Sequence, residues 1–380
     1  MKEELIKFCQ AAVQTRSYSD EEGDMAELLV EEMKKVGFDE VYIDRVGNAV
    51  GRIGNGPTII HFDGHMDTVQ VNDADEWEQP PFAGKIIDGW LWGRGSVDMK
   101  SSLCSAVYGA ALAKKNGWVD GKTIYVTGSV CEEYCDAVSL QHFYHDSGVW
   151  PDYCIICEPS DNIITLGHKG KAQVRITTHG VSAHGSAPEK GKNAVYEMAE
   201  IIQRVEMLNN SLYKENEAHG TVVLSDICSV EASLNAVPTE CTIYLDRRLA
   251  FSETLDQVKK EMDGLIKGKN ADWKVGTLLH TSWTGEELVY EPMHDPWKID
   301  IDAPLTQAIR AAYKDTFGID ADTYDFWDFG TNAPAPVSMG IPTIGFGVGE
   351  YKLAHMRNEK AEVAKIDKCC QVYANLIKNL

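Results

Sequence analysis

The chain of 380 residues contains 58 acidic and 36 basic residues, for a formal net charge of -22. This balance argues against nucleic acid or an anionic membrane as a partner, and the length suggests two or three domains. No apolar run is long enough to span a bilayer, and the N-terminus MKEELIKFCQAAV has the spacing of an amphipathic helix rather than a signal peptide. We therefore expect a cytoplasmic protein.

Helical and strand-like patterns alternate over the first part of the chain. A second helix is expected after Ser19, where Glu22 would complete a capping box, and it should end at Gly37. A third helix should begin near Ser101. The strand-like runs cover residues 41–44, 49–53, 58–62, 122–130 and 153–157. This alternation is typical of an α/β domain with a largely parallel sheet, whose ligands gather beyond the carboxyl ends of the strands.

Imidazole and carboxyl groups occur where these predicted strands end. In chain order they are His65, Asp67, Glu132, Glu133 and Glu158. Residues two apart in a strand point to the same side, so His65 and Asp67 would face one site together. A neighbouring carboxylate is how proteins orient a metal-binding histidine, although such a pair alone is more often structural. The pair therefore needs further partners.

Asp98 and His355 complete a set of ligands sufficient for two metal ions. The set is His65, Asp98, Glu133, Glu158 and His355. Histidine and carboxylate ligands suit zinc, with cobalt or manganese as substitutes. Structural alternatives remain open, such as a helix N-cap for Asp98 and an ordinary surface histidine for His355. The glycine-rich stretch 93–100 lacks the spacing of a nucleotide-binding loop.

The ten cysteines predict reduced, buried thiols rather than a disulfide framework. Cys154 and Cys157 have C-x-x-C spacing, with Cys131 and Cys135 shortly before them, so a four-thiolate zinc site is an alternative. Residues 154–157 read as a continuous strand, in which successive side chains face opposite ways. That pattern argues against the thiolate site.

From about residue 174 the pattern changes to strands at 174–178, 221–227 and 241–249, with helices at 193–208 and 252–266. A helix at 305–317, a strand at 342–347 and a terminal helix from Ala361 then resume the α/β pattern. We predict an α/β catalytic domain, 1–173 and 294–380, with a mixed, largely parallel sheet flanked by helices. A smaller α+β lid or dimerisation domain, 174–293, would interrupt it.

An ordered series of motifs spans the chain from His65 to Glu359. It comprises GHMDTV, GRGSVDMK, CEE, CEPS, SAHG, LNAVPTECTIYLDRR, GTN, and AH followed by NE. The series resembles the co-catalytic zinc hydrolases that include acetylornithine deacetylase, succinyl-diaminopimelate desuccinylase, aminoacylase and the glutamate carboxypeptidases. FDGHMDTV, HGSAPEKGKNAVYEMA and IPTIGFG are most similar to a subgroup of hydrolases linked to selenium metabolism.

The resemblance implies a site with two zinc ions. His65 and Glu158 would hold one ion. Glu133 and His355 would hold the other, and Asp98 would bridge them. In relatives the peptide bond after the bridging aspartate is often cis.

The resemblance also implies catalytic roles. Glu132 would be the general base that deprotonates a water between the two ions, and Asp67 would orient the first histidine. His184, within SAHG, would donate to the oxyanion across a dimer interface. A binding protein has no use for the base, so Glu132 argues against the alternative of a non-catalytic dimeric amino-acid or peptide-binding protein with a vestigial metal site.

Substrate-binding residues follow from the same motifs. Arg248 lies thirteen positions after Asn235, as in relatives where this arginine binds the substrate's carboxylate. Arg247 would point to the opposite face of its strand. Gly330 and Thr331 match a substrate-contacting loop. The expected activity is hydrolysis of an amide, N-acyl or peptide, in a small amino-acid-derived substrate with a free carboxylate, by a homodimer joined through the lid.

Overall fold

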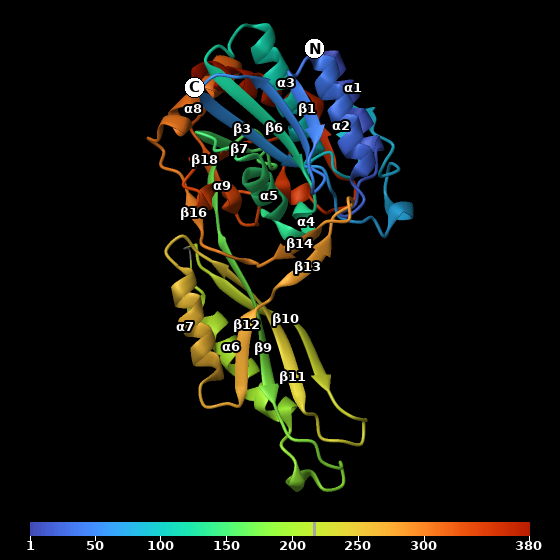
Figure 1. Cartoon of the computed structure of the whole chain (residues 1–380), viewed down its shortest axis with the longest axis vertical. Helices are drawn as coiled ribbons and strands as arrows, with labels where there is room; N and C mark the ends of the chain where they lie inside the picture. Colours follow the sequence, from blue (N-terminus) through green and yellow to red (C-terminus); the bar gives the residue numbers. More distant parts are fainter. Residues whose placement is uncertain (216–217) are drawn as a thin grey trace.

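The computed structural model describes residues 1–215 and 218–380. A large α/β part carries both termini, and a smaller, elongated part projects from one side of it (Figure 1). Among the described residues, none of the helices combines the length and the apolar composition of a membrane span.

The large part is built on a nine-stranded mixed sheet of order β1-β2-β6-β3-β7-β18-β8-β16, with β17 paired to β8. The four central strands β6, β3, β7 and β18 run parallel, so the predicted mixed, largely parallel sheet is confirmed. The strands are β1 (Glu40–Ile43), β2 (Ala49–Gly54), β3 (Thr58–His65), β6 (Lys122–Ser129), β7 (Tyr153–Ile156), β8 (Ile164–His168), β16 (Trp297–Lys298), β17 (Tyr324–Trp327) and β18 (Thr343–Gly345).

Helices cover both faces of this sheet, so its central strands are buried on both sides. One face packs against α1 (Lys2–Gln14), α2 (Gly23–Val36), α3 (Lys100–Lys115), α8 (Pro304–Phe317) and α10 (Val363–Asn379). The other packs against α5 (Val138–Ser147) and α9 (Pro334–Ser338). In β3, Ile60 and Phe62 join the first core. His61 faces the second layer, where its Nδ1 lies 2.7 Å from the Tyr144 hydroxyl.

The small part is an antiparallel sheet of order β10-β11-β9-β12 covered on one face by two helices. Its elements are β9 (Gly170–His179), α6 (Ala194–Leu212), β10 (Thr221–Val230), β11 (Glu240–Leu249), α7 (Leu255–Ile266) and β12 (Ala271–Val275). The chain enters through β9 and returns past β15 (Met293–His294), which pairs with the start of β9. Both connections therefore lie at the base of the small sheet.

One hairpin inside the range predicted for the lid belongs with the large part. β13 (Leu278–Thr281) and β14 (Glu287–Tyr290) pair with each other and pack against helices of the large part. Between the two strands, the Trp283 indole donates a 3.2 Å hydrogen bond to the carbonyl of Gly47. A Cβ at Gly47 would lie 2.2 Å from the same indole nitrogen, so the hairpin requires glycine there.

The remaining elements are short, and all except η2, which lies in the loop between β9 and α6, belong to the large part. They are η1 (Ala74–Glu76), β4 (Lys85–Ile87), β5 (Trp90–Trp92), α4 (Glu132–Cys135), η2 (Pro188–Lys190), η3 (Tyr351–Leu353) and β19 (Lys360–Glu362). β19, β5 and β4 form a three-stranded sheet beside the loops before α3 and after β18.

The capping box predicted for the second helix is wrong. α2 begins at Gly23, and its N-cap residue Glu22 makes no side-chain cap bond. Glu22 instead accepts a hydrogen bond from the Cys131 amide, and the Ser19 hydroxyl donates to Asp67 Oδ2 at 2.7 Å. Both polar side chains that looked like helix signals are therefore used in tertiary contacts beside the site.

Candidate active site

The parallel strands deliver the predicted polar groups to one edge of the sheet. His65 is the last residue of β3, Glu132 opens α4 shortly after β6, and Glu158 lies two residues beyond β7. Parallel strands end at a common edge, so these side chains meet there. Asp98 comes from the loop before α3, and His355 follows η3.

Two groups of side chains meet at Asp98, and in each the ligand atoms all lie within 4.8 Å of one another. The groups are His65, Asp98 and Glu158, and Asp98, Glu133 and His355. His65 Nε2 lies 2.9 Å from Asp98 Oδ1, and His355 Nε2 lies 3.3 Å from Asp98 Oδ2. Each oxygen of this carboxylate thus faces one histidine. The same geometry allows Asp98 to bridge two cations.

The site holds more negative charge than its two imidazoles balance. Burial and the neighbouring Glu158 raise the pKa of Glu132, and burial raises that of Glu158 itself. Hydrogen bonds to Asp98 and Glu133 raise the pKa of His355 to about 10. Raised pKa values of buried glutamates beside imidazoles whose pKa is also raised indicate that the cluster is short of positive charge. This donor set therefore fits divalent cations, which would supply the missing charge.

Asp67 contributes more to the site than the predicted orientation of His65. The His65 Nδ1 hydrogen bond, 2.9 Å, goes to the backbone carbonyl of Asp67, and the Asp67 carboxylate lies 3.5 Å from that nitrogen. The carboxylate accepts hydrogen bonds from the amides of Glu132 and Glu133, both at 3.1 Å. Asp67 therefore fixes both the first histidine and the start of the helix that carries both glutamates.

The loop carrying Asp98 is held by Glu359, which is fully buried. Its carboxylate accepts hydrogen bonds from the amides of Val97 at 2.8 Å and Asp98 at 3.1 Å, and from Arg94 at 2.6 Å. The Asp98–Met99 peptide bond is cis. Glu359 belongs to the NE motif, but the motif alone did not predict this structural role.

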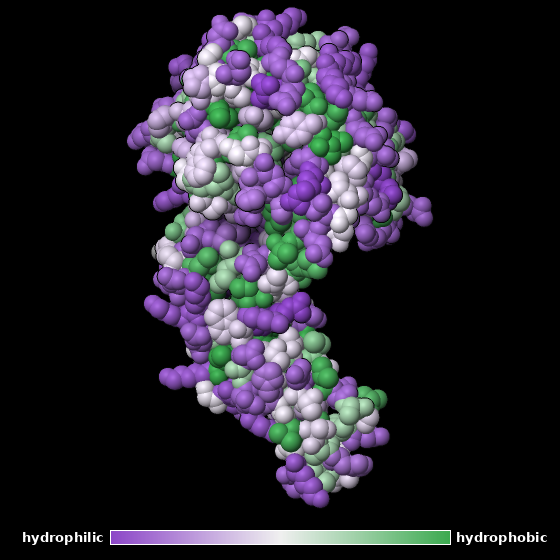
Figure 2. Space-filling model, viewed as in Figure 1, coloured by the Kyte–Doolittle hydropathy of each residue, from purple (hydrophilic) through white to green (hydrophobic). Residues whose placement is uncertain are grey.

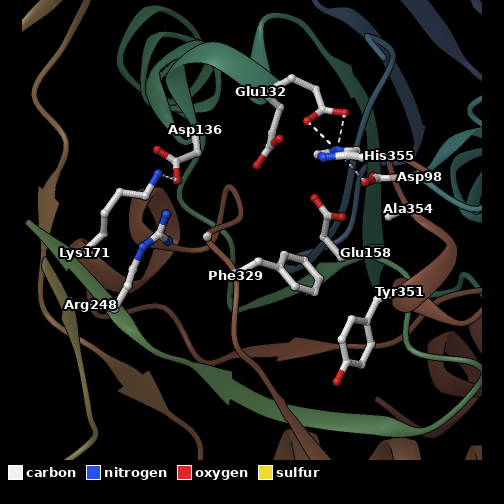
Figure 3. A pocket seen from close by; sticks show the side chains of 12 residues that line it. Asp98, Glu132, Asp136, Glu158, Lys171, Arg248, Phe329, Tyr351, Ala354 and His355 are labelled. Carbon is white, nitrogen blue, oxygen red and sulfur yellow. Dashed lines mark hydrogen bonds and ion pairs between the residues drawn. The ribbon is translucent and has the colours of Figure 1, made fainter. Parts of the chain in front are cut away.

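A cavity of about 320 Å³ opens beside the two ligand groups. Figure 3 shows Asp98, Glu158 and His355 on one side of this cavity, with Glu132 pointing into the space, and Lys171, Arg248 and Asp136 on the opposite side. Its lining residues are Asp98, Glu132, Glu133, Asp136, Glu158, Lys171, Arg248, Phe329, Gly330, Tyr351, Ala354 and His355. The sequence did not predict four of these lining residues, Asp136, Lys171, Phe329 and Tyr351.

Only two of the four predicted substrate-binding residues, Arg248 and Gly330, line the cavity. Thr331 is fully buried, and its hydroxyl accepts from the Ala333 amide, so its side chain does not reach the cavity. His184 and Asn235 are exposed and lie on adjacent segments, where the amide of Gly185 donates to the Asn235 carbonyl.

The loop that carries His184 follows β9 at the end of the small part farthest from the large part (Figure 1). Within the described residues of one chain, neither His184 nor Asn235 lines the cavity.

The side chains of Arg247 and Arg248 lie on opposite faces of β11, as expected for successive residues of a strand. Arg247 is fully buried beneath α7, paired with Glu253 at 2.7 Å and Glu261 at 3.0 Å. Arg248 lies on the other face of β11, where Asp246 holds its guanidinium at 2.9 Å. Only Arg248 is available to a ligand in the cavity.

The cysteines do not gather into a metal site in the described chain. Cys154 lies in one core of the large sheet, where it contacts the Tyr144 hydroxyl, and Cys157 lies in the other. All ten cysteines are free, and neither group of potential metal ligands includes one. The four-thiolate alternative is therefore rejected.

The fold and this acidic, imidazole-containing cavity define a hydrolase of the metallopeptidase class. The chain belongs to peptidase family M20/M25/M40, whose model matches residues 61–379. It is therefore a hydrolytic enzyme that acts on amide bonds, as the motif resemblance implied.

Similar proteins cover almost the whole chain. It is 36% identical to the uncharacterized protein YgeY of Escherichia coli K12, over 98% of this chain and 93% of that protein. It is 26% identical to a succinyl-diaminopimelate desuccinylase of Cereibacter sphaeroides, over 97% and 96%. Among solved structures, the aminopeptidase PepT of Bacillus cereus has a TM-score of 0.72 at 21% identity, covering 100% of this chain and 98% of that one.

A further solved structure is a dinuclear metal-binding M20 peptidase of Bacillus subtilis. It has a TM-score of 0.69 at 13% identity and covers 99% of this chain and 97% of that one. At these identities the structural likeness establishes the shared fold.

Proposed function

We propose that the protein is a two-metal amidohydrolase that cleaves an N-acyl or peptide bond beside a free carboxylate. The observation that carries this proposal is the sharing of Asp98 between two ligand groups, with Glu132 in the same cavity and Arg248 on the opposite wall. A substrate carboxylate at Arg248 would place its amide toward the ligand groups.

Each residue of the site has a separate role in the proposed reaction. His65 and Glu158 would hold one ion, and Glu133 and His355 the other. The set suits zinc, or cobalt or manganese in its place. When bound, the ions would supply a more acidic water and polarise the scissile carbonyl. Glu132 would accept the proton of the attacking water and pass it to the leaving amine. Arg248 would orient the substrate by donating hydrogen bonds to its carboxylate.

Substrate screening tests the reaction. The zinc-loaded protein should hydrolyse members of a panel of N-acyl amino acids and dipeptides, with release of the free amine as the readout. A wild-type protein that binds two metal ions yet cleaves no member would contradict the proposed substrate class.

Metal analysis tests the centre. Protein purified without chelator should contain about two equivalents of zinc or a similar ion per chain. Removing them should lower Tm, because a ligand that binds only the folded state stabilises it, and zinc should restore Tm. Elemental analysis and a thermal melt measure both effects. An unchanged Tm and no metal uptake would exclude the two-metal site.

We further propose a homodimer joined through the small part. β10 is an edge strand whose outer residues Val223, Ile227 and Val230 are exposed, and Leu234 in the following turn is 96% exposed. An open apolar strand edge favours pairing with another chain. Figure 2 shows hydrophobic residues breaking the polar surface of this part. Such a dimer would let His184, which is remote from its own cavity, reach the partner's.

A mixed dimer tests whether His184 acts across the interface. Glu132→Gln and His184→Ala chains, carrying different tags, should each form nearly inactive homodimers. Their purified mixed dimer contains one cavity with both groups intact, so it should regain about half of wild-type activity. Steady-state rates of the three dimers decide the point. An inactive mixed dimer, or a fully active monomer in light scattering, would overturn this arrangement.

A further inference from the structure

Lys171 is a second cation on the wall of the cavity that faces the ligand groups. It lies on β9 directly opposite Arg248 of β11 in the antiparallel register. Both side chains line the cavity, and Figure 3 shows them together on the side away from His355 and Asp98. A substrate whose amide reaches the ligand groups therefore extends toward two cations.

The ammonium group of Lys171 is held in a fixed position. Its Nζ donates to Asp136 Oδ2 at 2.7 Å and to the Tyr290 hydroxyl at 2.8 Å. The side chain is only 12% exposed. An ammonium group has three N–H donors, so one remains for a ligand.

Gly330 shows how closely the cavity wall approaches this ammonium. A Cβ at Gly330 would lie 3.3 Å from Lys171 Nζ and 2.4 Å from Asp136 Oδ2. A side chain at this position would collide with the Lys171–Asp136 pair. Glycine leaves the ammonium group open to the cavity.

Arg248 is held in a comparable way and also keeps free donors. Its Nε and Nη2 bind the two oxygens of Asp246, at 2.9 and 3.0 Å. Its Nη1 makes no hydrogen bond to any residue that the structure describes. Because both cations are already fixed by their own carboxylates, little side-chain entropy is lost when a ligand binds.

We propose that Lys171 binds the substrate's carboxylate together with Arg248, so that the enzyme requires a free carboxylate and rejects its uncharged amide. This inference rests on the proposed function. Two adjacent, oriented cations match an anion with two oxygens, and hydrogen bonds between charged partners are about twice as strong as neutral ones. The substrates would then be N-acyl amino acids or peptides with a free C-terminus, and not peptides with a blocked C-terminus.

A purely structural role for Lys171 makes a different prediction. Asp136 follows α4 of the large part, whereas Lys171 belongs to the small part, so their ion pair also joins the two. If joining were its only role, loss of Lys171 would impair carboxylate and amide substrates equally. Selectivity between them separates the roles.

The test compares the best carboxylate substrate of the N-acyl amino acid and dipeptide panel with its carboxamide. Lys171→Met should lower kcat/KM for the carboxylate about 10- to 100-fold, mainly through KM, which corresponds to one lost charge-assisted hydrogen bond. The rate on the carboxamide should change less than about twofold. Lys171→Arg, which keeps a cation, should retain part of the selectivity.

Two variants serve as controls. Lys169→Met removes a lysine that pairs with Asp328 outside the cavity, and it should leave the selectivity unchanged. Lys171→Met combined with Asp136→Asn leaves no unpaired buried charge, so it covers the case in which the single variant folds poorly.

Equal losses on both substrates, or no loss, would overturn the inference. If the wild type cleaves no panel member, the proposed function fails, and calorimetric binding of the same carboxylates to wild type and Lys171→Met decides the inference. Weaker binding by the variant then supports it, whereas equal binding or none overturns it.

Discussion

Replacing Glu132 with glutamine should lower kcat by about 10²- to 10⁴-fold, the usual contribution of a general base. Glutamine keeps the size of the side chain but has no basic oxygen to accept the proton. Glu132 belongs to neither ligand group, so bound metal should stay at the wild-type level. Steady-state kinetics and elemental analysis of the same preparation measure both quantities.

The neighbouring glutamate provides the matched control for this experiment. Glu133→Gln alters a carboxylate whose Oε2 lies 2.9 Å from His355 Nε2, within one of the ligand groups. It should lower metal content together with activity. A Glu132→Gln enzyme that retains most of its kcat, or that loses metal as Glu133→Gln does, would show that Glu132 is not the base.

The sequence predicted the edge of the sheet well because strand ends have a local signal. The apolar run before His65 and the run before Glu158 both become parallel strands, and each polar residue lies beyond the last apolar one. Strands that are buried on both faces appear in the sequence as apolar runs, so they can be recognised without knowledge of the tertiary structure. The fold class could therefore be predicted with the positions of these groups.

Residues that act through distant partners had no such signal. Lys171 and Arg248 are 77 positions apart in the chain and meet only through the register of β9 and β11. Ser19 and Glu22 match a capping box as well as their actual tertiary contacts, and only the predicted capping box was wrong, since α2 itself forms. The local sequence pattern could not distinguish a helix cap from a tertiary hydrogen bond, because the same side-chain oxygen can accept or donate in both.

The placement of His184 illustrates a different limit. Its motif predicted a role at the reaction centre, yet the described chain places it in an exposed loop, where its Nδ1 accepts a hydrogen bond from the Ser186 hydroxyl at 2.7 Å. The proposed role of His184 therefore depends on the proposed dimer.

Glu359 connects the two halves of the proposed metal centre. It lies four residues after His355, and its carboxylate binds the amides of the loop that carries Asp98. Its other partner, Arg94, is only 4% exposed and stacks over Trp77 at 5.3 Å. The segment 355–359 thus carries the proposed ligand His355 and, through Glu359, also fixes the loop that carries Asp98.

Replacing Glu359 with alanine should lower the free energy of unfolding by about 3 to 5 kcal/mol, because it leaves the Arg94 charge buried without a partner. The Asp98 loop would lose both amide contacts, so metal affinity should also fall, which metal titration measures beside chemical denaturation. Glu359→Gln keeps an acceptor oxygen and should lose less of both. Glu362→Ala, which removes a partly exposed ion pair with Lys365, should cost under about 1 kcal/mol. Wild-type stability and metal affinity in Glu359→Ala would show that the Asp98 loop holds its position without this residue.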